Sequence, residues 1–383
     1  MPPRFETLCV HHAERRGRYE GAAAPPIFQT STFTHAAAAD FDRRTADDYA
    51  GFDYTRTANP TTTILEEKIA ALEHGEAARA FGSGMAAISA AILSCVKSGD
   101  HISAVDTAYG PTRSLLNDFM PRYDIRTTYV PGTRVDDFAQ AVRPETRLVF
   151  LETPSSLVFA IQDLDAVCRF ARSRKITTIC DNSYATPYFQ RPLALGVDLV
   201  VHTATKYIGG HSDVVAGLAV GARERIAAMS KVEGQLLGGV LDPFAAWLLL
   251  RGLRTLAIRL ERHQASALTI AKALEKHAKV ARVFHPGLET HPDYDVARHQ
   301  MAGTSGMLSF VLTDDQRDAA HRFVDALQYF GIAVSWGGYE SLVIPIRLKP
   351  PGAAQGRWGA RLSVGLEHVD DLLEDVHAAL DAV

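Results

Sequence analysis

Short apolar runs alternate with longer amphipathic stretches along much of the chain. Five runs, bounded by polar residues, glycine or proline, have strand length: 101–105, 126–130, 147–151, 176–180 and 197–201. Runs of this length rich in β-branched residues are typical of buried strands, whereas the stretches between them have the length and periodicity of helices. Alternation of strand and helix predicts a mostly parallel sheet that is covered on both faces, in an α/β fold.

A helix is predicted to begin at Pro60. Proline suits the first helical turn, and Leu65, Ile69 and Leu72 are spaced four and three apart, so they share one face. Gly75 is the expected stop. A second helix of small and apolar residues is predicted to follow the Phe-Gly-Ser-Gly-Met stretch at 81–85.

The composition divides the chain into three parts. Residues 1–50 are rich in Ala, Pro, Arg and Asp with little periodicity, and we interpret them as an arm that covers another surface, such as a second subunit. Residues 51–240 form the predicted large domain, and 241–383 form a smaller α/β domain that opens on a long helical region. Further elements of this domain are expected near 281–284, 306–312, 317–329 and 369–380, with a loop at 349–359.

Bulk composition excludes several classes of function. The formal net charge of −4 over 383 residues gives no reason to expect nucleic acid or an anionic membrane as a partner. The chain lacks a run of 18 apolar residues and a signal-peptide core, so we expect a cytoplasmic protein. Its four scattered cysteines predict reduced thiols, and its fifteen dispersed histidines give no ligand set, so no metal site is expected.

Polar residues follow two of the predicted strands directly. Asp181 comes after 176–180, and Thr203, Thr205 and Lys206 come soon after 197–201. If these strands are parallel neighbours, their carboxyl ends share the crevice where open α/β sheets bind ligands. The pattern therefore predicts that an acid, a lysine and two threonine hydroxyls lie close together.

Lys206 is the strongest candidate for a reactive group. The chain has nine lysines, and most of the others lie in polar, helix-like or loop contexts. A lysine at the end of a buried strand loses solvation, so its pKa falls and its free amine can form a Schiff base. The alternative is a surface lysine that pairs with Asp213.

The stretches Asp-Asn-Ser-Tyr from Asp181 and Thr-Ala-Thr-Lys-Tyr-Ile-Gly-Gly-His-Ser-Asp from Thr203 resemble the pyridoxal-phosphate site of the Cys/Met-metabolism enzymes. This family includes cystathionine β-lyase, cystathionine γ-synthase and γ-lyase, methionine γ-lyase and the homoserine sulfhydrylases. The resemblance extends from about residue 54 to the C-terminus. It implies fold type I, the aspartate-aminotransferase-like fold, with Lys206 holding pyridoxal 5'-phosphate covalently and Asp181 facing the pyridine nitrogen.

Elementary electrostatics supports an acid at position 181. A carboxylate about 4 Å from a pyridinium, at an effective dielectric constant near 20, contributes roughly 4 kcal/mol. That energy raises the pKa of the ring nitrogen by roughly three units, so the ring stays protonated at neutral pH and can accept electrons from a substrate carbanion.

The resemblance also assigns the other cofactor contacts. Gly84 and Met85, at the start of a predicted helix, would offer backbone N–H groups to the phosphate, with the hydroxyls of Thr203 and Thr205 as further donors. A glycine pair of this kind is often only a tight turn.

Three aromatic or basic residues complete the expected cofactor site. Tyr109 matches the family tyrosine that lies against the pyridine ring, although an aromatic residue at a strand end is often simple packing. In the family, the counterparts of Tyr54 and Arg56 reach the phosphate of the neighbouring subunit, within a homotetramer built from dimers. Without the resemblance, Arg56 would be interpreted as a solvated loop charge.

Substrate binding is assigned to four residues by the same resemblance. Arg361 matches the arginine that holds the substrate α-carboxylate, and a planar guanidinium suits that role because it donates two parallel hydrogen bonds. Its alternative is a surface strand charge. Ser335 and Trp336 resemble the corresponding stretch of cystathionine β-lyase, and Ser156 stands where γ-specific relatives often have asparagine.

The resemblance implies an enzyme acting on a sulfur-containing L-amino acid. We expect β-elimination of L-cystathionine, or of a related cysteine S-conjugate, to a thiol such as homocysteine, pyruvate and ammonia. Lys206 would be the general base, and Tyr109, with Tyr54 of a partner chain, the acid for the leaving sulfur. A γ-acting relative is the main alternative, because the stretch around Tyr54 and Arg56 is closer to the γ-enzymes. A catalytically silent oligomeric scaffold is the alternative from another class.

Overall fold

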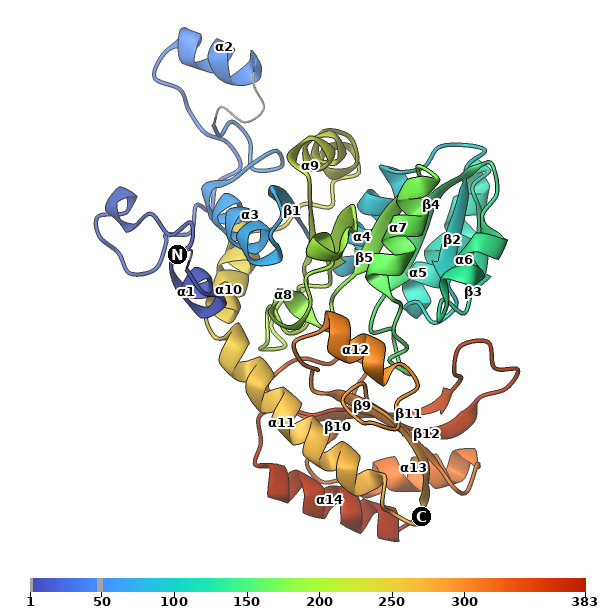
Figure 1. The fold of residues 1–383 in the computed structure, drawn as a ribbon. Helices are drawn as coiled ribbons and strands as arrows, with labels where there is room; N and C mark the ends of the chain where they lie inside the picture. Colours follow the sequence, from blue (N-terminus) through green and yellow to red (C-terminus); the bar gives the residue numbers. More distant parts are fainter. Residues whose placement is uncertain (1–2, 47–50) are drawn as a thin grey trace.

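A seven-stranded sheet forms the centre of the large domain in this computed structural model, which describes residues 3–46 and 51–383 (Figure 1). The strands in chain order are β1 Ala77–Phe81, β2 His101–Val105, β3 Arg126–Val130, β4 Thr146–Glu152, β5 Thr177–Asp181, β6 Leu199–His202 and β7 Gly217–Gly221. They lie in the order β1-β7-β6-β5-β4-β2-β3. Strands β2 to β6 are mutually parallel and β7 is antiparallel to both neighbours. The predicted mostly parallel sheet is therefore confirmed.

Helices cover this sheet. They are α3 Pro60–Glu73, α4 Gly84–Leu93, α5 Gly110–Ser114, α6 Val135–Ala141, α7 Leu164–Ser173, α8 Thr186–Phe189 and α9 Arg223–Met229. Single π-helical or 3₁₀ turns occur at Leu115–Phe119, Met120–Tyr123, Pro192–Leu195 and Ser230–Gly234. Strands β2, β4, β5 and β6 are almost wholly inaccessible to solvent, as expected for a sheet with helices on both faces.

Helix α3 shows why the local sequence prediction succeeds. The Asn59 side chain accepts a hydrogen bond from the Thr61 N–H at 2.9 Å, and Pro60 occupies the first turn. Leu65, Ile69 and Leu72 are fully buried on its inner face. The helix ends at Glu73, because His74 adopts a left-handed conformation (φ 59°) just before the predicted stop at Gly75.

The C-terminal domain begins with two helices, α10 Pro243–Leu253 and α11 Leu256–Leu274. Its sheet has the order β10-β11-β12-β9-β8, formed by β8 Val280–Phe284, β9 Met307–Leu312, β10 Gly331–Ile332, β11 Leu342–Leu348 and β12 Arg357–Ser363. The other helices are α12 Tyr294–Gln300, α13 Arg317–Ala326 and α14 Val369–Asp381. The predicted loop at 349–359 is too long at its end, because β12 already begins at Arg357.

The N-terminal segment packs in part on its own chain. Its helices are α1 Phe5–His11 and α2 Ala38–Ala46, with a 3₁₀ turn at Arg16–Arg18. Phe5 and Cys9 are buried against their own chain, and the ammonium of Lys68 on α3 donates to the Cys9 carbonyl at 2.7 Å and to Glu14 at 2.6 Å. The first residues therefore cover their own large domain, whereas α2 projects away from it (Figure 1). The predicted arm boundary at residue 50 lies outside the described residues.

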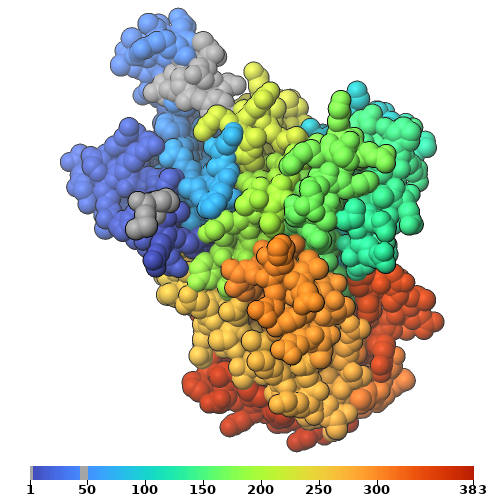
Figure 2. All heavy atoms as spheres, in the orientation of Figure 1, coloured from blue at the N-terminus to red at the C-terminus, as the bar shows by residue number. Residues whose placement is uncertain are grey.

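The two domains pack directly on each other. In Figure 2 the segment around α12 lies against the large domain. There the Ile161 N–H donates to the Asp293 carboxylate at 2.9 Å, and the Gln300 amide donates to the Gln162 carbonyl at 3.1 Å. Among residues 3–46 and 51–383, helices that combine the length and apolar character needed to cross a bilayer do not occur.

The four cysteines are free thiols. Cys9, Cys168 and Cys180 are buried, and Cys95 is partly exposed. Burial raises the pKa of Cys168 to about 11 and that of Cys180 well above its ordinary value. Cys180 lies in β5, directly before Asp181.

Candidate active site

A cavity of about 750 Å³ opens at the carboxyl ends of the central strands, where the two domains meet. It is lined by ten of the thirteen residues that the sequence assigns to the site: Gly84, Met85, Tyr109, Ser156, Asp181, Thr203, Thr205, Lys206, Trp336 and Arg361. Strands β5 and β6 are parallel neighbours, with Asp181 opposite Val201. The predicted juxtaposition of acid, lysine and threonines is therefore confirmed.

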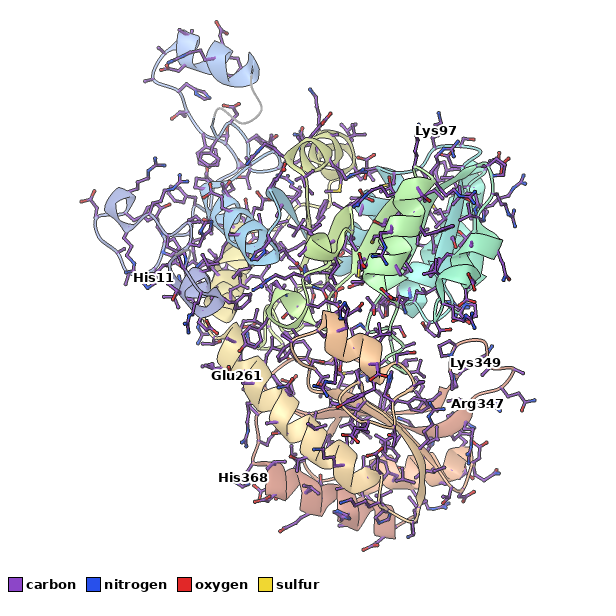
Figure 3. All side chains as sticks on the ribbon, viewed as in Figure 1. His11, Lys97, Glu261, Arg347, Lys349 and His368 are labelled. Atoms are coloured by element: carbon purple, nitrogen blue, oxygen red, sulfur yellow. The ribbon has the colours of Figure 1, made fainter. Side chains whose placement is uncertain are left out.

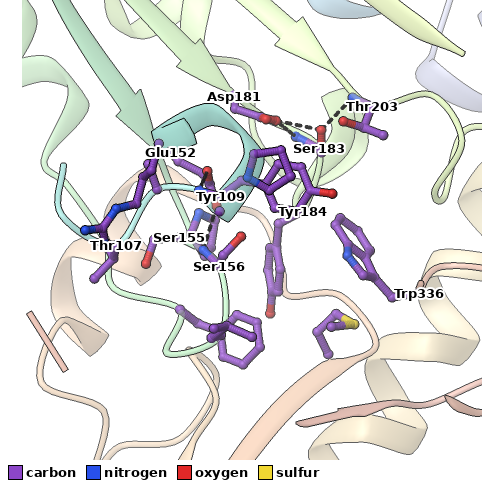
Figure 4. Close-up of a pocket in the computed structure, with 18 of the residues that line it drawn as sticks. Thr107, Tyr109, Glu152, Ser155, Ser156, Asp181, Ser183, Tyr184, Thr203 and Trp336 are labelled. Atoms are coloured by element: carbon purple, nitrogen blue, oxygen red, sulfur yellow. Dashed lines mark hydrogen bonds between the residues drawn. The ribbon is translucent and has the colours of Figure 1, made fainter. Parts of the chain in front are cut away.

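Asp181 ends β5 with its carboxylate buried. Its Oδ1 accepts two hydrogen bonds from Ser183, from the N–H at 2.9 Å and from the hydroxyl at 2.6 Å (Figure 4). The Ser183 oxygen in turn accepts the Thr203 N–H at 2.6 Å, which links the ends of β5 and β6. Burial raises the pKa of Asp181, whereas the Ser183 hydrogen bonds lower it. The carboxylate is thus oriented but poorly solvated, an environment that favours a cationic partner.

Glu152 is a buried acid of the site that the sequence analysis missed. It ends β4 and stands opposite Asp181 in the strand register. Its Oε2 accepts the Tyr109 N–H at 2.7 Å, and its Oε1 accepts the Ser156 N–H at 2.6 Å. Burial and then the charge of Asp181 raise the pKa of Glu152 to about 8. Glu152 therefore tends to hold a proton at neutral pH and fixes the backbone at both predicted site residues.

A usable signal for Glu152 was present in the sequence. It follows the predicted strand 147–151 directly, just as Asp181 follows 176–180. In a parallel sheet, two acids at the same position of adjacent strands must be neighbours.

Lys206 lies in the turn after β6 and points toward the C-terminal domain. Its Nζ donates to the Ser335 hydroxyl at 2.9 Å and lies 5.2 Å from the centre of the Trp336 ring. Burial, and then the nearby charge of Arg361, lower the pKa of Lys206 to about 8. The amine is directed to Ser335 rather than to the surface residue Asp213. Ser335 does not line the cavity itself and reaches the site through its contacts with Lys206 and Arg361.

The start of α4 forms a cradle for an anion. The Ser83 hydroxyl accepts the Ala86 N–H at 3.0 Å, and helix geometry leaves the N–H groups of Gly84 and Met85 without an intrahelical acceptor. A Cβ atom at position 84 would overlap the Thr203 side chain, so glycine is needed for Thr203 to approach the start of α4 this closely. A phosphate fits such a helix start.

The two threonines differ in their availability. The Thr205 hydroxyl donates to the Ala216 carbonyl at 3.2 Å and accepts the Ala216 N–H at 3.0 Å. These two hydrogen bonds tie the turn to Ala216, the residue before β7. The Thr203 hydroxyl lies beside Gly84 and is therefore the more available hydrogen-bond donor.

Arg361 is a buried cation on β12. One of its terminal nitrogens, Nη2, donates to the carbonyls of Val334 at 3.0 Å and Ser335 at 2.9 Å, and its Nε has no hydrogen-bond partner. Burial lowers the pKa of Arg361 to about 10. Within the described residues it has no acidic counter-ion. A buried guanidinium of this kind favours an anionic ligand, and the alternative of an exposed strand charge is wrong.

Tyr109 directly precedes α5 and is 42% exposed at the cavity wall, with its backbone held by Glu152 (Figure 4). Tyr54 and Arg56 lie elsewhere and do not line this cavity. Arg56 donates to the Gln235 carbonyl at 3.2 Å and stacks 5.6 Å from the centre of the half-exposed Tyr54 ring. Their assignment to a cofactor requires a second subunit.

Comparison with known proteins identifies the family. The family model described as Cys/Met metabolism PLP-dependent enzyme matches residues 6–381. The chain belongs to the Cys/Met metabolism PLP-dependent enzymes. Membership fixes pyridoxal phosphate as the cofactor, and it places the chain among fold-type-I enzymes and, at the level of reaction class, among carbon–sulfur lyases.

Individual relatives are similar over almost the whole chain. An L-methionine gamma-lyase of Fusobacterium nucleatum is 42% identical, covering 98% of each protein. A cystathionine beta-lyase of Lactococcus lactis is 39% identical, covering 98% of this chain and 99% of the relative. The crystal structure of metB from Corynebacterium glutamicum superimposes with a TM-score of 0.92 at 35% identity, covering 99% of this chain and 98% of the other. Relatives of this Cys/Met family thus carry both β- and γ-lyase names.

Proposed function

We propose that the chain catalyses β-elimination from sulfur-containing L-amino acids, with L-cystathionine or a related cysteine S-conjugate as substrate. Addition of water to cystathionine in this reaction yields homocysteine, pyruvate and ammonia. The arrangement that carries the proposal is the Lys206 amine, which is held at Ser335 and against the Trp336 ring, with Arg361 buried nearby. A base and a carboxylate-binding cation thus share one cavity.

The residues present fit pyridoxal phosphate. Gly84, Met85 and Thr203, which line the cavity at the start of α4, would hold its phosphate, and Asp181 would pair with the ring nitrogen. Lys206 would bind it covalently through Nζ. When bound, this group supplies an aldehyde that captures amines and a ring that accepts electrons.

The side chains of the cavity would orient the substrate and transfer protons. Arg361 orients the substrate by its α-carboxylate, for which Nη1 and Nε are available. Lys206, with a pKa of about 8, can release and take up a proton at Nζ near neutral pH, as a general base must. The Tyr109 hydroxyl would protonate the leaving sulfur, and Glu152 holds the backbone of that tyrosine in place.

Two features of the cavity support β- over γ-elimination. γ-Elimination needs proton transfers at both Cα and Cβ, so its base must serve two positions. Here the Lys206 amine is restrained by Ser335 and by the Trp336 ring, which also packs 5.5 Å from the Tyr207 ring, centre to centre. Ser156 adds a short hydroxyl where the γ-acting relatives often have asparagine.

γ-Elimination from L-methionine is the second candidate. It is favoured by the 42% identity to an L-methionine gamma-lyase and by the sequence around Tyr54 and Arg56. A catalytically silent scaffold would require a damaged site, whereas Lys206, Asp181 and Arg361 all face one cavity.

Product analysis separates the two reactions. The purified protein, loaded with pyridoxal phosphate, is incubated with L-cystathionine and with L-methionine. Pyruvate and homocysteine from cystathionine are expected. Release of 2-oxobutyrate with cysteine, or of 2-oxobutyrate with methanethiol from methionine, would identify the γ-enzyme instead.

We also infer a homotetramer of dimers in which Tyr54 and Arg56 complete the site of a partner. Their position outside their own cavity supports this arrangement. Mixing an Arg56→Ala variant with a Lys206→Ala variant tests it. Subunit exchange should restore some activity to the mixture, and a mixture as inactive as its parts would contradict a shared site.

A further inference from the structure

Two cations lie at the mouth of the cavity, far along the chain from its catalytic residues. Arg347 is the penultimate residue of β11, and Lys349 begins the turn that joins β11 to β12. Both residues are exposed, and together with Pro350 they line the same cavity as Lys206 and Arg361. In Figure 3 both lie beside this turn, which extends from the C-terminal domain toward the large domain.

The turn is fastened to the large domain. The Gly352 N–H donates to the Asp106 carboxylate at 3.2 Å, directly after β2. Gly352 adopts φ 66°, a conformation that glycine accepts readily. Across the turn, the Arg347 Nε donates to the Gly356 carbonyl at 3.0 Å. These two contacts hold the cations at the cavity mouth.

The mouth has more positive than negative charge. In the described part of the chain, neither Arg347 nor Lys349 forms an ion pair, and Arg113 nearby donates to the Asp106 carbonyl rather than to a carboxylate. Three acids line the cavity: Asp106 accepts the Gly352 N–H, Asp181 accepts two hydrogen bonds from Ser183 at the end of β5, and Glu152 has its pKa raised to about 8. An anionic group entering here therefore meets two cations that are not neutralised by an acidic partner among the described residues.

We propose that Arg347 and Lys349 bind a second anionic group of the substrate, a carboxylate at the far end of its sulfur substituent. The inference rests on the proposed function and names its substrate class: L-amino acid thioethers whose leaving thiol carries a carboxylate. Arg361, buried inside the cavity, takes the α-carboxylate. The two positions together select dicarboxylic over monocarboxylic thioethers.

Two matched substrates test this selection. S-(2-carboxyethyl)-L-cysteine and S-propyl-L-cysteine have substituents of similar length, and only the first ends in a carboxylate. We expect wild-type kcat/KM to favour the carboxyethyl substrate. In an Arg347→Gln/Lys349→Gln variant this ratio should fall about tenfold, mainly through KM, since an exposed ion pair contributes modestly and two cations are removed.

Control variants separate charge from structure. Arg347→Lys/Lys349→Arg keeps both charges and should keep most of the preference. Lys97→Gln removes an exposed cation far from the cavity and should leave the ratio at the wild-type value (Figure 3). The wild-type KM for the carboxyethyl substrate should rise between roughly 0.05 and 0.5 M salt, whereas that of the glutamine variant should stay nearly flat.

The outcomes distinguish this inference from the proposed function. If wild-type protein releases pyruvate from both substrates and the glutamine variant keeps the same ratio, the inference is overturned and the β-lyase proposal stands. If wild-type protein cleaves only homocysteine thioethers, the β-elimination proposal is overturned. The preference for a carboxylate is then tested with S-(2-carboxyethyl)-L-homocysteine and S-propyl-L-homocysteine. Equal losses on both members of a pair would also overturn the inference.

Discussion

The Lys206 ammonium donates a 2.9 Å hydrogen bond to the Ser335 hydroxyl, so the central amine of the large domain is held by the C-terminal domain. The next residue, Trp336, lies against the same amine, and Arg361 donates to the Ser335 carbonyl at 2.9 Å. The lysine and the buried arginine are therefore coupled through one short segment.

The pKa of Lys206 should be measurable in the protein without cofactor. Only the free amine attacks an aldehyde, so the rate of pyridoxal-phosphate capture should rise with pH and level off above about 8. Arg361→Leu removes a neighbouring positive charge and should move the inflection to higher pH. Stopped-flow absorbance would follow the reaction, and Lys206→Ala should abolish it. An inflection near the ordinary lysine value in wild type would contradict the assigned environment.

Asp181→Asn should separate cofactor binding from catalysis. The amide can still accept a hydrogen bond from Ser183, but it loses the charge that keeps the ring nitrogen protonated. With roughly 4 kcal/mol at stake, kcat should fall by about 10²–10³-fold, while a visible cofactor spectrum remains. Steady-state kinetics with spectra of the same sample provide the measurement. Turnover close to wild type would remove Asp181 from this role.

Glu152→Gln should change how the stability of the cofactor-free protein depends on pH. A folded-state pKa of about 8 lies above the ordinary value of 4.5, so the folded state binds the extra proton. The resulting stabilisation is fully present below the unfolded-state pKa and is lost as pH rises through about 8. Melting temperatures between about pH 5 and 9 should fall more steeply in wild type than in the glutamine variant.

The difference between the two profiles is the readout, because other groups contribute equally to both. The amide oxygen can serve only one of the two N–H donors, from Tyr109 and Ser156, so the variant should be less stable at acid pH. Parallel profiles would show that Glu152 is not the titrating group.

Gly84→Ala should weaken cofactor binding. The added methyl group would overlap the Thr203 side chain and push this phosphate donor away from the start of α4. We expect the dissociation constant for pyridoxal phosphate to rise about tenfold, which corresponds to roughly 1.4 kcal/mol. Gly17→Ala is the matched control, because a Cβ atom there meets nothing within 4 Å. Equal affinities of all three proteins would argue against the phosphate cradle.

Arg361→Leu should act mainly on substrate affinity. Charged hydrogen bonds to a carboxylate contribute about 1.5–3 kcal/mol, so KM should rise about ten- to hundredfold. Arg361→Lys retains the charge but not the planar guanidinium, so its KM should lie between those of wild type and the leucine variant. Initial-rate kinetics on one substrate are sufficient, and an unchanged KM in the leucine variant would exclude Arg361 as the carboxylate clamp.

Five of the seven strands of the large domain could be predicted because their signals are local, whereas β1 and β7 were not predicted. The strands at 101–105 and 126–130 have the predicted bounds, since polar and helical residues flank the runs closely. Strands β11 and β12 were not predicted, because Pro345 and Gly359 interrupt them. Both residues normally disfavour a strand interior. At Gly359 the neighbouring strand β9 approaches so closely that a side chain would overlap the Phe310 carbonyl.

Only those residues of the site that lie in single motifs, or that the family resemblance assigns, could be predicted. Asp181, Thr203 and Lys206 lie near one another in sequence and in space, so a strand pattern was sufficient. The contact between Lys206 and Ser335 joins residues 129 positions apart and depends on how the domains pack. Arg347 and Lys349 required a hairpin that no local signal indicated. Residue types can be predicted from motifs, but their partners follow from tertiary packing.

A buried cysteine can report how often the structure around it opens. Alkylating reagents attack thiolates, and the Cys180 thiol is inaccessible inside β5 with its pKa raised well above normal. Its labelling rate under native conditions therefore measures how often the strand that carries Asp181 separates from its neighbours. Cofactor that holds this strand closed would slow the labelling, so mass spectrometry of a single peptide could follow occupancy of the site without any assay of turnover.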